Sequence, residues 1–271
     1  MLRTHYLLRT MPIEAVIFDL DDTLIVDEAI SREAFEETAI QASKYGARQE
    51  AFITDAMRIA REDWAKSPQV DYCRSIGISA FECLWGNFDG EADPLPMLKA
   101  WSAKFRVDIF DKALRVQGIE TPEAGNVLSK VFMDSRRKFA RLMSNAMEII
   151  VELSAKYSLG LLTNGAPAFQ RDKFKASGLT EYFKAVAISG DHGIGKPDAK
   201  IFHWLLDQLG VKPESAVMVG NSVERDILGA HRAGIKSVWI EVSGSEEHAD
   251  AKPDYVIKDL SELPALLEKI S

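Results

Sequence analysis

The chain has 271 residues, of which 46% are hydrophobic and 27% charged, as in ordinary globular proteins. A formal net charge of −8 argues against a nucleic-acid partner, and no apolar run approaches the roughly 18 to 20 residues of a membrane span. Its two cysteines, Cys73 and Cys83, are too few for a disulfide framework or a zinc site, so we expect packing residues in a cytoplasmic protein without a membrane partner.

The chain begins with a basic stretch, residues 1–10, whose apolar run is too short for a signal peptide, and we expect a frayed extension without a function. Residues 15–18 are apolar and break into the polar residues 19–23, which predicts a buried strand followed by a loop. From residue 25 to about residue 143 the pattern is helical and rich in aromatics. We expect the aromatic side chains of this stretch to form its own hydrophobic core: Phe81, Trp85, Phe88, Trp101 and Phe105.

Strands and helices alternate after residue 144. The predicted strands are 158–162, 185–189, 216–219, 236–240 and 255–257, and the predicted helices are 145–157, 168–177, 198–209, 225–233 and 261–270. Such alternation indicates parallel βαβ units and a doubly wound α/β sheet. We therefore predict an α/β core, residues 1–24 and 144–271, interrupted after its first strand by an all-helical domain, residues 25–143. An insertion there lies above the carboxyl ends of the strands, where such sheets bind ligands.

Four polar segments follow predicted strands, and in a parallel sheet they converge on one edge. They are Asp19-Leu20-Asp21-Asp22-Thr23, Thr163-Asn164-Gly165, Gly195-Lys196-Pro197-Asp198, and Gly220-Asn221-Ser222 with Asp226. Carboxylates two residues apart, Asp19 and Asp21, are able to hold a divalent hard cation and to divide into a nucleophile and an acid. Nearby carboxylates are expected to raise the pKa of Asp21 so that it donates a proton to a leaving oxygen.

The other segments supply groups for a phosphate and a metal. The hydroxyl of Thr163 and the backbone N–H groups after it, beginning with Asn164, are suited to phosphate oxygens. Lys196 adds a positive charge that offsets the phosphoryl charge. Asp226, about one helical turn after Asn221, is expected to reach the metal directly or through water.

These residues resemble the haloacid dehalogenase superfamily of hydrolases, in particular its phosphatases with a helical, C1-type cap. Residues 16–24 are similar to the first motif of that family, and Thr163-Asn164-Gly165 with Gln170 and Lys173 looks like the second. The resemblance covers about residues 13–24 and 144–271. It implies a magnesium-dependent phosphatase that hydrolyses a small phosphorylated metabolite, a sugar phosphate or a nucleotide-like ester, through an aspartyl-phosphate.

The resemblance also implies roles for single residues. Asp19 is the implied nucleophile and Asp21 the implied general acid and base, while Thr163 and Lys196 hold the phosphate. Magnesium is implied on Asp19, on the carbonyl of Asp21 and on the fourth motif, residues 221–226, with Asn221 and Asp226 as alternative ligands.

One departure keeps alternatives open. The fourth motif usually begins Gly-Asp, whereas this chain has Gly220-Asn221, which removes one negative charge from the metal site. A non-catalytic protein that binds a phosphate ligand is therefore one alternative. Phosphonate cleavage, phosphate mutation and dehalogenation are others, although the presence of Asp21 favours phosphate esters. The physiological substrate and the oligomeric state stay open.

Plainer roles are expected for other polar residues. Asp198 is predicted to be the N-cap of the helix after Pro197, and Asp22 to be structural. The basic run at residues 135–138 is predicted to be a solvated helix face, with steering of an anionic substrate as the alternative.

Overall fold

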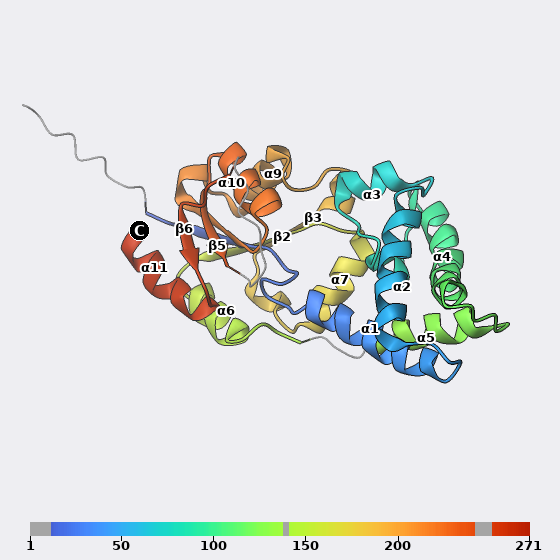
Figure 1. Cartoon of the computed structure of the whole chain (residues 1–271). Helices are drawn as coiled ribbons and strands as arrows, with labels where there is room; N and C mark the ends of the chain where they lie inside the picture. The colour runs from blue at the N-terminus through green and yellow to red at the C-terminus, as the bar shows by residue number, and fades with distance from the viewer. Residues whose placement is uncertain (1–11, 138–140, 242–250) are drawn as a thin grey trace, which may run out of the picture.

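The computed structural model describes residues 12–137, 141–241 and 251–271, so the predicted N-terminal extension, residues 1–10, lies outside the described residues. Six parallel strands form one sheet in the order β3-β2-β1-β4-β5-β6 (Figure 1). The strands are β1 Ala15–Phe18, β2 Ser158–Thr163, β3 Ala185–Ile188, β4 Ala216–Gly220, β5 Lys236–Ile240 and β6 Tyr255–Ile257. The order reverses beside β1, as in doubly wound sheets, and the predicted α/β fold class is confirmed.

Helices cover both faces of the sheet. They are α6 Ala146–Ser154 and α11 Leu263–Ile270 on one face, with α9 Ala199–Leu209 and α10 Leu228–Ala233 on the other. Strand β1 is fully buried because its alternate side chains enter the two cores, Val16 and Phe18 on the side of α6, Ala15 and Ile17 on the side of α9. Burial on both faces explains why this strand reads as an unbroken apolar run.

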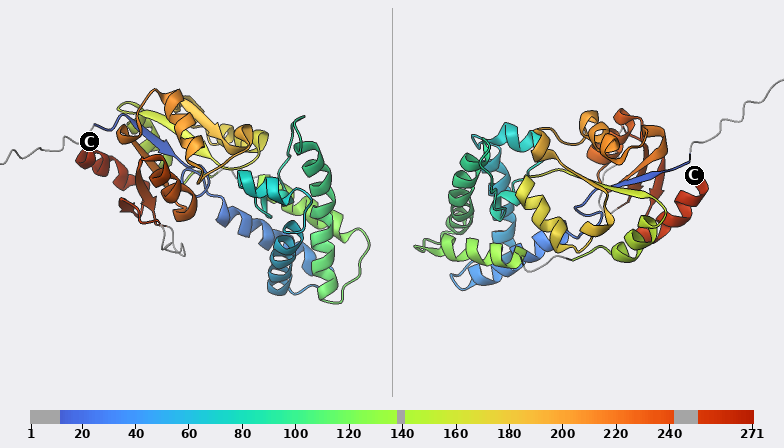
Figure 2. Two further views of the ribbon diagram at one scale, coloured as in Figure 1. Left: turned by 90° about the horizontal axis from the view of Figure 1, so that it is seen from above. Right: turned by 180° about the vertical axis from the view of Figure 1, so that it is seen from behind.

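The segment between β1 and β2 is helical. Its helices are α1 Glu28–Ser43, α2 Gln49–Trp64, α3 Val70–Ile76, η1 Glu82–Leu84, α4 Leu95–Val116 and α5 Ala124–Arg137. They gather at one end of the molecule, beyond the sheet (Figure 2). Of the predicted aromatics, Trp85, Phe88 and Phe105 lie in one hydrophobic cluster of this segment, and Phe81 and Trp101 are partly buried and pack against it. Cys73 and Cys83 are buried in the same cluster as free thiols. The cluster also includes Phe169, which comes from the core helix α7 Pro167–Ala176, so it is not formed by the insertion alone.

The two connections between the helical segment and the core run side by side. The Val26 N–H donates to the Arg141 carbonyl at 2.8 Å, and the Met143 N–H donates to the Leu24 carbonyl at 2.9 Å. The predicted domain boundaries fall on this pair of linkers, and the division into two domains stays a prediction. Within the described residues, no helix is both long and apolar enough to cross a bilayer.

Candidate active site

The site is built around Asp19, which directly follows β1. Lys196, from the loop after α8 (Ser189–His192), places its Nζ 2.6 Å from Asp19 Oδ1 and 2.7 Å from Asp226 Oδ1. The loops that follow β1 and β4 therefore meet at the Lys196 ammonium. The Lys196 side chain is 2% exposed, so its charge is compensated by these two carboxylates rather than by water.

Burial and charge act in opposite directions on Asp19. Burial raises the pKa of this carboxyl, Lys196 lowers it and Asp226 raises it, with a resulting pKa of about 6. The carboxylate is thus mostly ionised at neutral pH, as a nucleophile requires. The same two carboxylates outweigh the effect of burial on Lys196 and raise its pKa.

Asp226 is completely buried and lies on a π-helical turn, η4 Val223–Ile227. Its Oδ2 accepts a hydrogen bond from the Ser222 N–H at 2.9 Å. Gly220 makes room for this carboxylate, since a Cβ atom at position 220 would lie 2.2 Å from Asp226 Oδ2. The turn, predicted only as part of an ordinary helix, therefore places a carboxylate under the end of β4.

Asn221 lies next to this carboxylate but has its own partners. Its side-chain oxygen accepts a hydrogen bond from the Thr23 hydroxyl at 3.4 Å, and its carbonyl accepts one from the Trp239 indole at 2.9 Å. Whether Asn221 or Asp226 is a direct metal ligand stays a prediction.

The donors around Asp19 fit a hard divalent cation. Asp19 and Asp226 carry two negative charges and Lys196 one positive charge, so this group keeps a net negative charge for a cation. The ranges 12–137, 141–241 and 251–271 hold no cluster of three or more His, Cys, Asp or Glu residues placed around one ion. A magnesium ion at this point would take its remaining ligands from uncharged oxygens, for which the Asp21 carbonyl and Asn221 are the predicted candidates.

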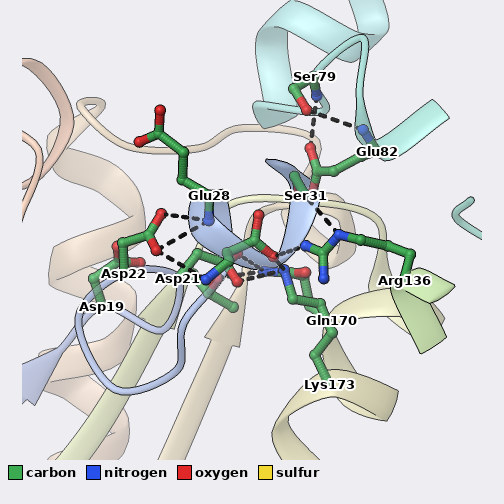
Figure 3. Close-up of polar contacts among 12 residues, drawn as sticks. Asp19, Asp21, Asp22, Glu28, Ser31, Ser79, Glu82, Arg136, Gln170 and Lys173 are labelled. Atoms are coloured by element: carbon green, nitrogen blue, oxygen red, sulfur yellow. Dashed lines mark hydrogen bonds and ion pairs between the residues drawn. The ribbon is translucent and has the colours of Figure 1, made fainter. Parts of the chain in front are cut away.

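Asp21 is held by two residues of α7 (Figure 3). Its carboxylate forms an ion pair with Lys173, and its Oδ2 accepts a hydrogen bond from Gln170 Nε2 at 3.0 Å. The same Nε2 donates to the Thr163 hydroxyl at 2.6 Å, so Gln170 joins the loops after β1 and β2. Burial is the main cause that raises the pKa of Asp21, while Lys173 lowers it; neighbouring carboxylates, the expected cause, contribute less.

Asn164 supports Lys196 with its side chain. Asn164 Nδ2 donates to the Lys196 carbonyl at 3.0 Å, and the Lys196 N–H donates to Asn164 Oδ1 at 2.8 Å. Both polar ends of the amide are thereby used to fix the lysine backbone. The predicted contact of Asn164 with a phosphate would therefore be made by its backbone N–H, and this contact stays a prediction.

Two carboxylates have the structural roles expected for them. Asp22 adopts a left-handed backbone conformation (φ +54°) and accepts hydrogen bonds from the N–H groups of Asp27 and Glu28, so that it caps α1. Asp198 is the N-cap of α9 and accepts from the Lys200 N–H at 2.9 Å. Both predictions are confirmed.

The prediction for the basic run was wrong for Ser135 and Arg136. Ser135 is 1% exposed and Arg136 3% exposed, and the Arg136 guanidinium pairs with Asp27, at the start of α1. Lys138 lies outside the described residues. The reason is helix phase: Arg136 follows the buried Phe132 by four residues and so continues the buried face of α5. This four-residue spacing is the sequence feature from which the burial of Arg136 was predictable. No role was predicted for Asp27 or for the buried Glu82.

Comparison with known proteins finds a hydrolase family and phosphatases among the proteins similar to this chain. A family model described as haloacid dehalogenase-like hydrolase matches residues 13–234. The chain is 35% identical to the phosphoserine phosphatase of Thermus thermophilus over 249 residues, which cover 92% of this chain and 96% of that protein. It is 30% identical to the N-acylneuraminate-9-phosphatase of Rattus norvegicus over 262 residues, with 95% of each protein covered.

Solved structures of similar fold span nearly the whole chain. The HAD-hydrolase YfnB from Bacillus subtilis, bound to magnesium, has a TM-score of 0.59 at 22% identity and covers 95% of this chain and 99% of its own. A 2-haloacid dehalogenase from Pseudomonas syringae has a TM-score of 0.58 at 26% identity, with 96% and 100% covered.

Proposed function

Because this chain belongs to the haloacid dehalogenase-like hydrolase family and is a phosphatase by its relatives, we propose that it hydrolyses a small phosphate monoester with magnesium, through an aspartyl-phosphate on Asp19. The observation that carries the proposal is the pairing of the buried Asp19 with Lys196. A carboxylate that is ionised at neutral pH, next to a fixed cation, is suited to attack phosphorus while the phosphoryl charge is offset.

The first step forms a bond between a carboxylate oxygen of Asp19 and phosphorus, and the bond from phosphorus to the leaving oxygen breaks. Asp21 gives its proton to that oxygen, which leaves as an alcohol. In the second step Asp21 takes a proton from water, whose oxygen attacks the aspartyl-phosphate and releases inorganic phosphate. The raised pKa of Asp21 supports this double role, because the group must be protonated in the first step.

Positioning of the phosphate falls to Thr163 and Lys196. The Thr163 hydroxyl is already oriented by Gln170, and the Lys196 backbone is fixed by Asn164, so both groups are ordered before a substrate arrives. A bound magnesium ion would supply further positive charge beside the transferred phosphoryl group. Asp19 and Asp226 are the charged oxygens available to hold it.

The substrate is proposed to be small, in keeping with the names of the relatives, which act on phosphoserine, N-acylneuraminate 9-phosphate or glyceraldehyde 3-phosphate. The sequence-based expectation of a sugar phosphate or a nucleotide-like ester remains part of the proposal. A location in the cytoplasm is proposed as well.

The test is phosphate release from a set of such monoesters, with magnesium and with a chelator, by the wild-type protein and by Asp19→Asn. We expect metal-dependent turnover by the wild type and none by the variant. Full activity of Asp19→Asn would contradict the mechanism. Halide release from a 2-haloacid, without phosphate release from any ester, would favour dehalogenation instead.

A further inference from the structure

Five side chains from four parts of the chain form a closed ring beside Asp21. The ring runs through Asp27 in the linker, Arg136 on α5, Trp85 just after η1, and Phe169 and Lys173 on α7. Neither the sequence-based site nor the steps described above include Asp27, Trp85, Phe169 or Arg136.

One half of the ring is ionic. Asp27 Oδ1 lies 2.9 Å from Lys173 Nζ and also accepts a hydrogen bond from the Arg136 guanidinium. Arg136 Nε donates to the Ser31 hydroxyl at 3.0 Å, which fixes the plane of the guanidinium. Burial alone would raise the pKa of Asp27, but the two cations outweigh it and lower the pKa to about 2. This carboxylate therefore stays charged between its partners.

The other half of the ring is aromatic. The guanidinium carbon of Arg136 lies 4.3 Å from the centre of the Trp85 ring, and Trp85 meets Phe169 edge to face at 4.4 Å. Lys173 Nζ lies 5.4 Å from the centre of the Phe169 ring and so closes the circuit. Cations over aromatic faces and edge-to-face pairs both have preferred geometries, so this half restrains the same two cations from the other side.

A single side chain, that of Lys173, connects the ring to Asp21. Lys173 is 7% exposed and pairs with both Asp21 and Asp27, and Arg136 and Lys173 extend toward the same point in Figure 3. The Lys173 ammonium therefore lies between two carboxylates. One is Asp21, which takes part in the proposed reaction, and the other is Asp27, which pairs with Arg136 of α5. Any displacement of Asp27 or Arg136 changes where Lys173, and with it the Asp21 carboxyl, is held.

We propose that Arg136 and Asp27 are positioning residues of the reaction: they hold Lys173 and, through it, Asp21, so that helix α5 contributes to proton transfer without touching the phosphate. This proposal rests on the proposed function, in which Asp21 is the general acid and base. Its specific consequence is a defect that depends on how much the leaving group needs a proton.

The experiment compares an alkyl phosphate with p-nitrophenyl phosphate, whose leaving group needs little protonation. In Arg136→Met we expect kcat/KM, which reports the first step alone, to fall by about tenfold more for the alkyl ester than for the aryl ester, since small misplacements of a catalytic group cost up to about 10²-fold. Arg136→Lys keeps a cation for Asp27 and is expected to restore most of the alkyl activity. Lys130→Met, at an exposed position of the same helix, is the matched control and is expected to match the wild type.

Equal losses of kcat/KM on both esters in Arg136→Met, or no loss on either, would overturn the proposal. If Arg136→Met does not fold, Asp27→Asn serves instead, because it keeps the shape of the side chain and removes the charge shared by Lys173 and Arg136. The same alkyl-selective loss is expected, and an equal loss on both esters would again overturn the proposal. Failure of the proposed function is distinct, because the wild type would then show no metal-dependent turnover of either ester.

Discussion

Gly220→Ala adds one methyl group, and the structure shows how closely that group would approach the Asp226 carboxylate. A methyl group at position 220 would lie 2.2 Å from Oδ2 and 2.4 Å from Cγ of Asp226. Ordinary contact requires the carboxylate to move by more than about 1 Å. Such a move breaks the 2.9 Å hydrogen bond from Ser222 and the 2.7 Å ion pair with Lys196.

The expected cost combines overpacking with the loss of partners by a buried charge. We expect Gly220→Ala to lower the free energy of unfolding by about 3 kcal/mol, measured by chemical denaturation, and to weaken magnesium binding in a calorimetric titration. Gly118→Ala is the matched control, because a methyl group there meets nothing within 4 Å and only the positive φ of +74° is strained, at a cost of about 1 kcal/mol. Equal costs for the two variants, with unchanged metal binding, would refute the placement of Asp226 by Gly220.

Three further predictions concern charge. Asp21→Asn should lose on the order of 10²- to 10⁴-fold in the rate of the first step on alkyl phosphates yet give a burst of aryl alcohol in rapid mixing, and equal slowing of that first step for both esters would disprove its acid role. Asn221→Asp should tighten magnesium binding by calorimetry, whereas unchanged binding would show that position 221 is not a ligand. Burial raises the pKa of Glu82 to about 7, above its ordinary 4.5, although Lys173 opposes this. Protonation therefore stabilises the folded protein, and this stability, about 3 kcal/mol, is complete below about pH 4.5 and lost as the pH rises to about 7. Denaturation of Glu82→Gln across this range should lack that slope, and an unchanged slope would exclude Glu82 as its source.

The strands of the core were predictable because each is a short apolar run that ends in a polar or glycine-containing turn. Their ends shifted by about one residue, as for β2, which continues to Thr163. The π-helical turn at Val223–Ile227 was not predictable, because it depends on how Asp226 fits beneath Gly220 rather than on local propensity.

In the site, the meeting of Asp19 with Lys196 followed from the rule that parallel strands bring their carboxyl ends to one edge. The pairing of Arg136 with Asp27 did not, because it depends on the orientation of α5 relative to the linker. A run of charges along a sequence does not show which of its members faces inward.

Phosphorylation of Asp19 is tested by trapping the intermediate. Asp21→Asn is mixed with p-nitrophenyl phosphate and magnesium, quenched with acid and analysed by intact-mass and peptide mass spectrometry. We expect one added phosphoryl group per chain, on the peptide that contains Asp19, and none when Asp19→Asn is treated in the same way. Aryl alcohol released without a phosphorylated peptide, or a phosphoryl group on any other residue, would contradict this expectation.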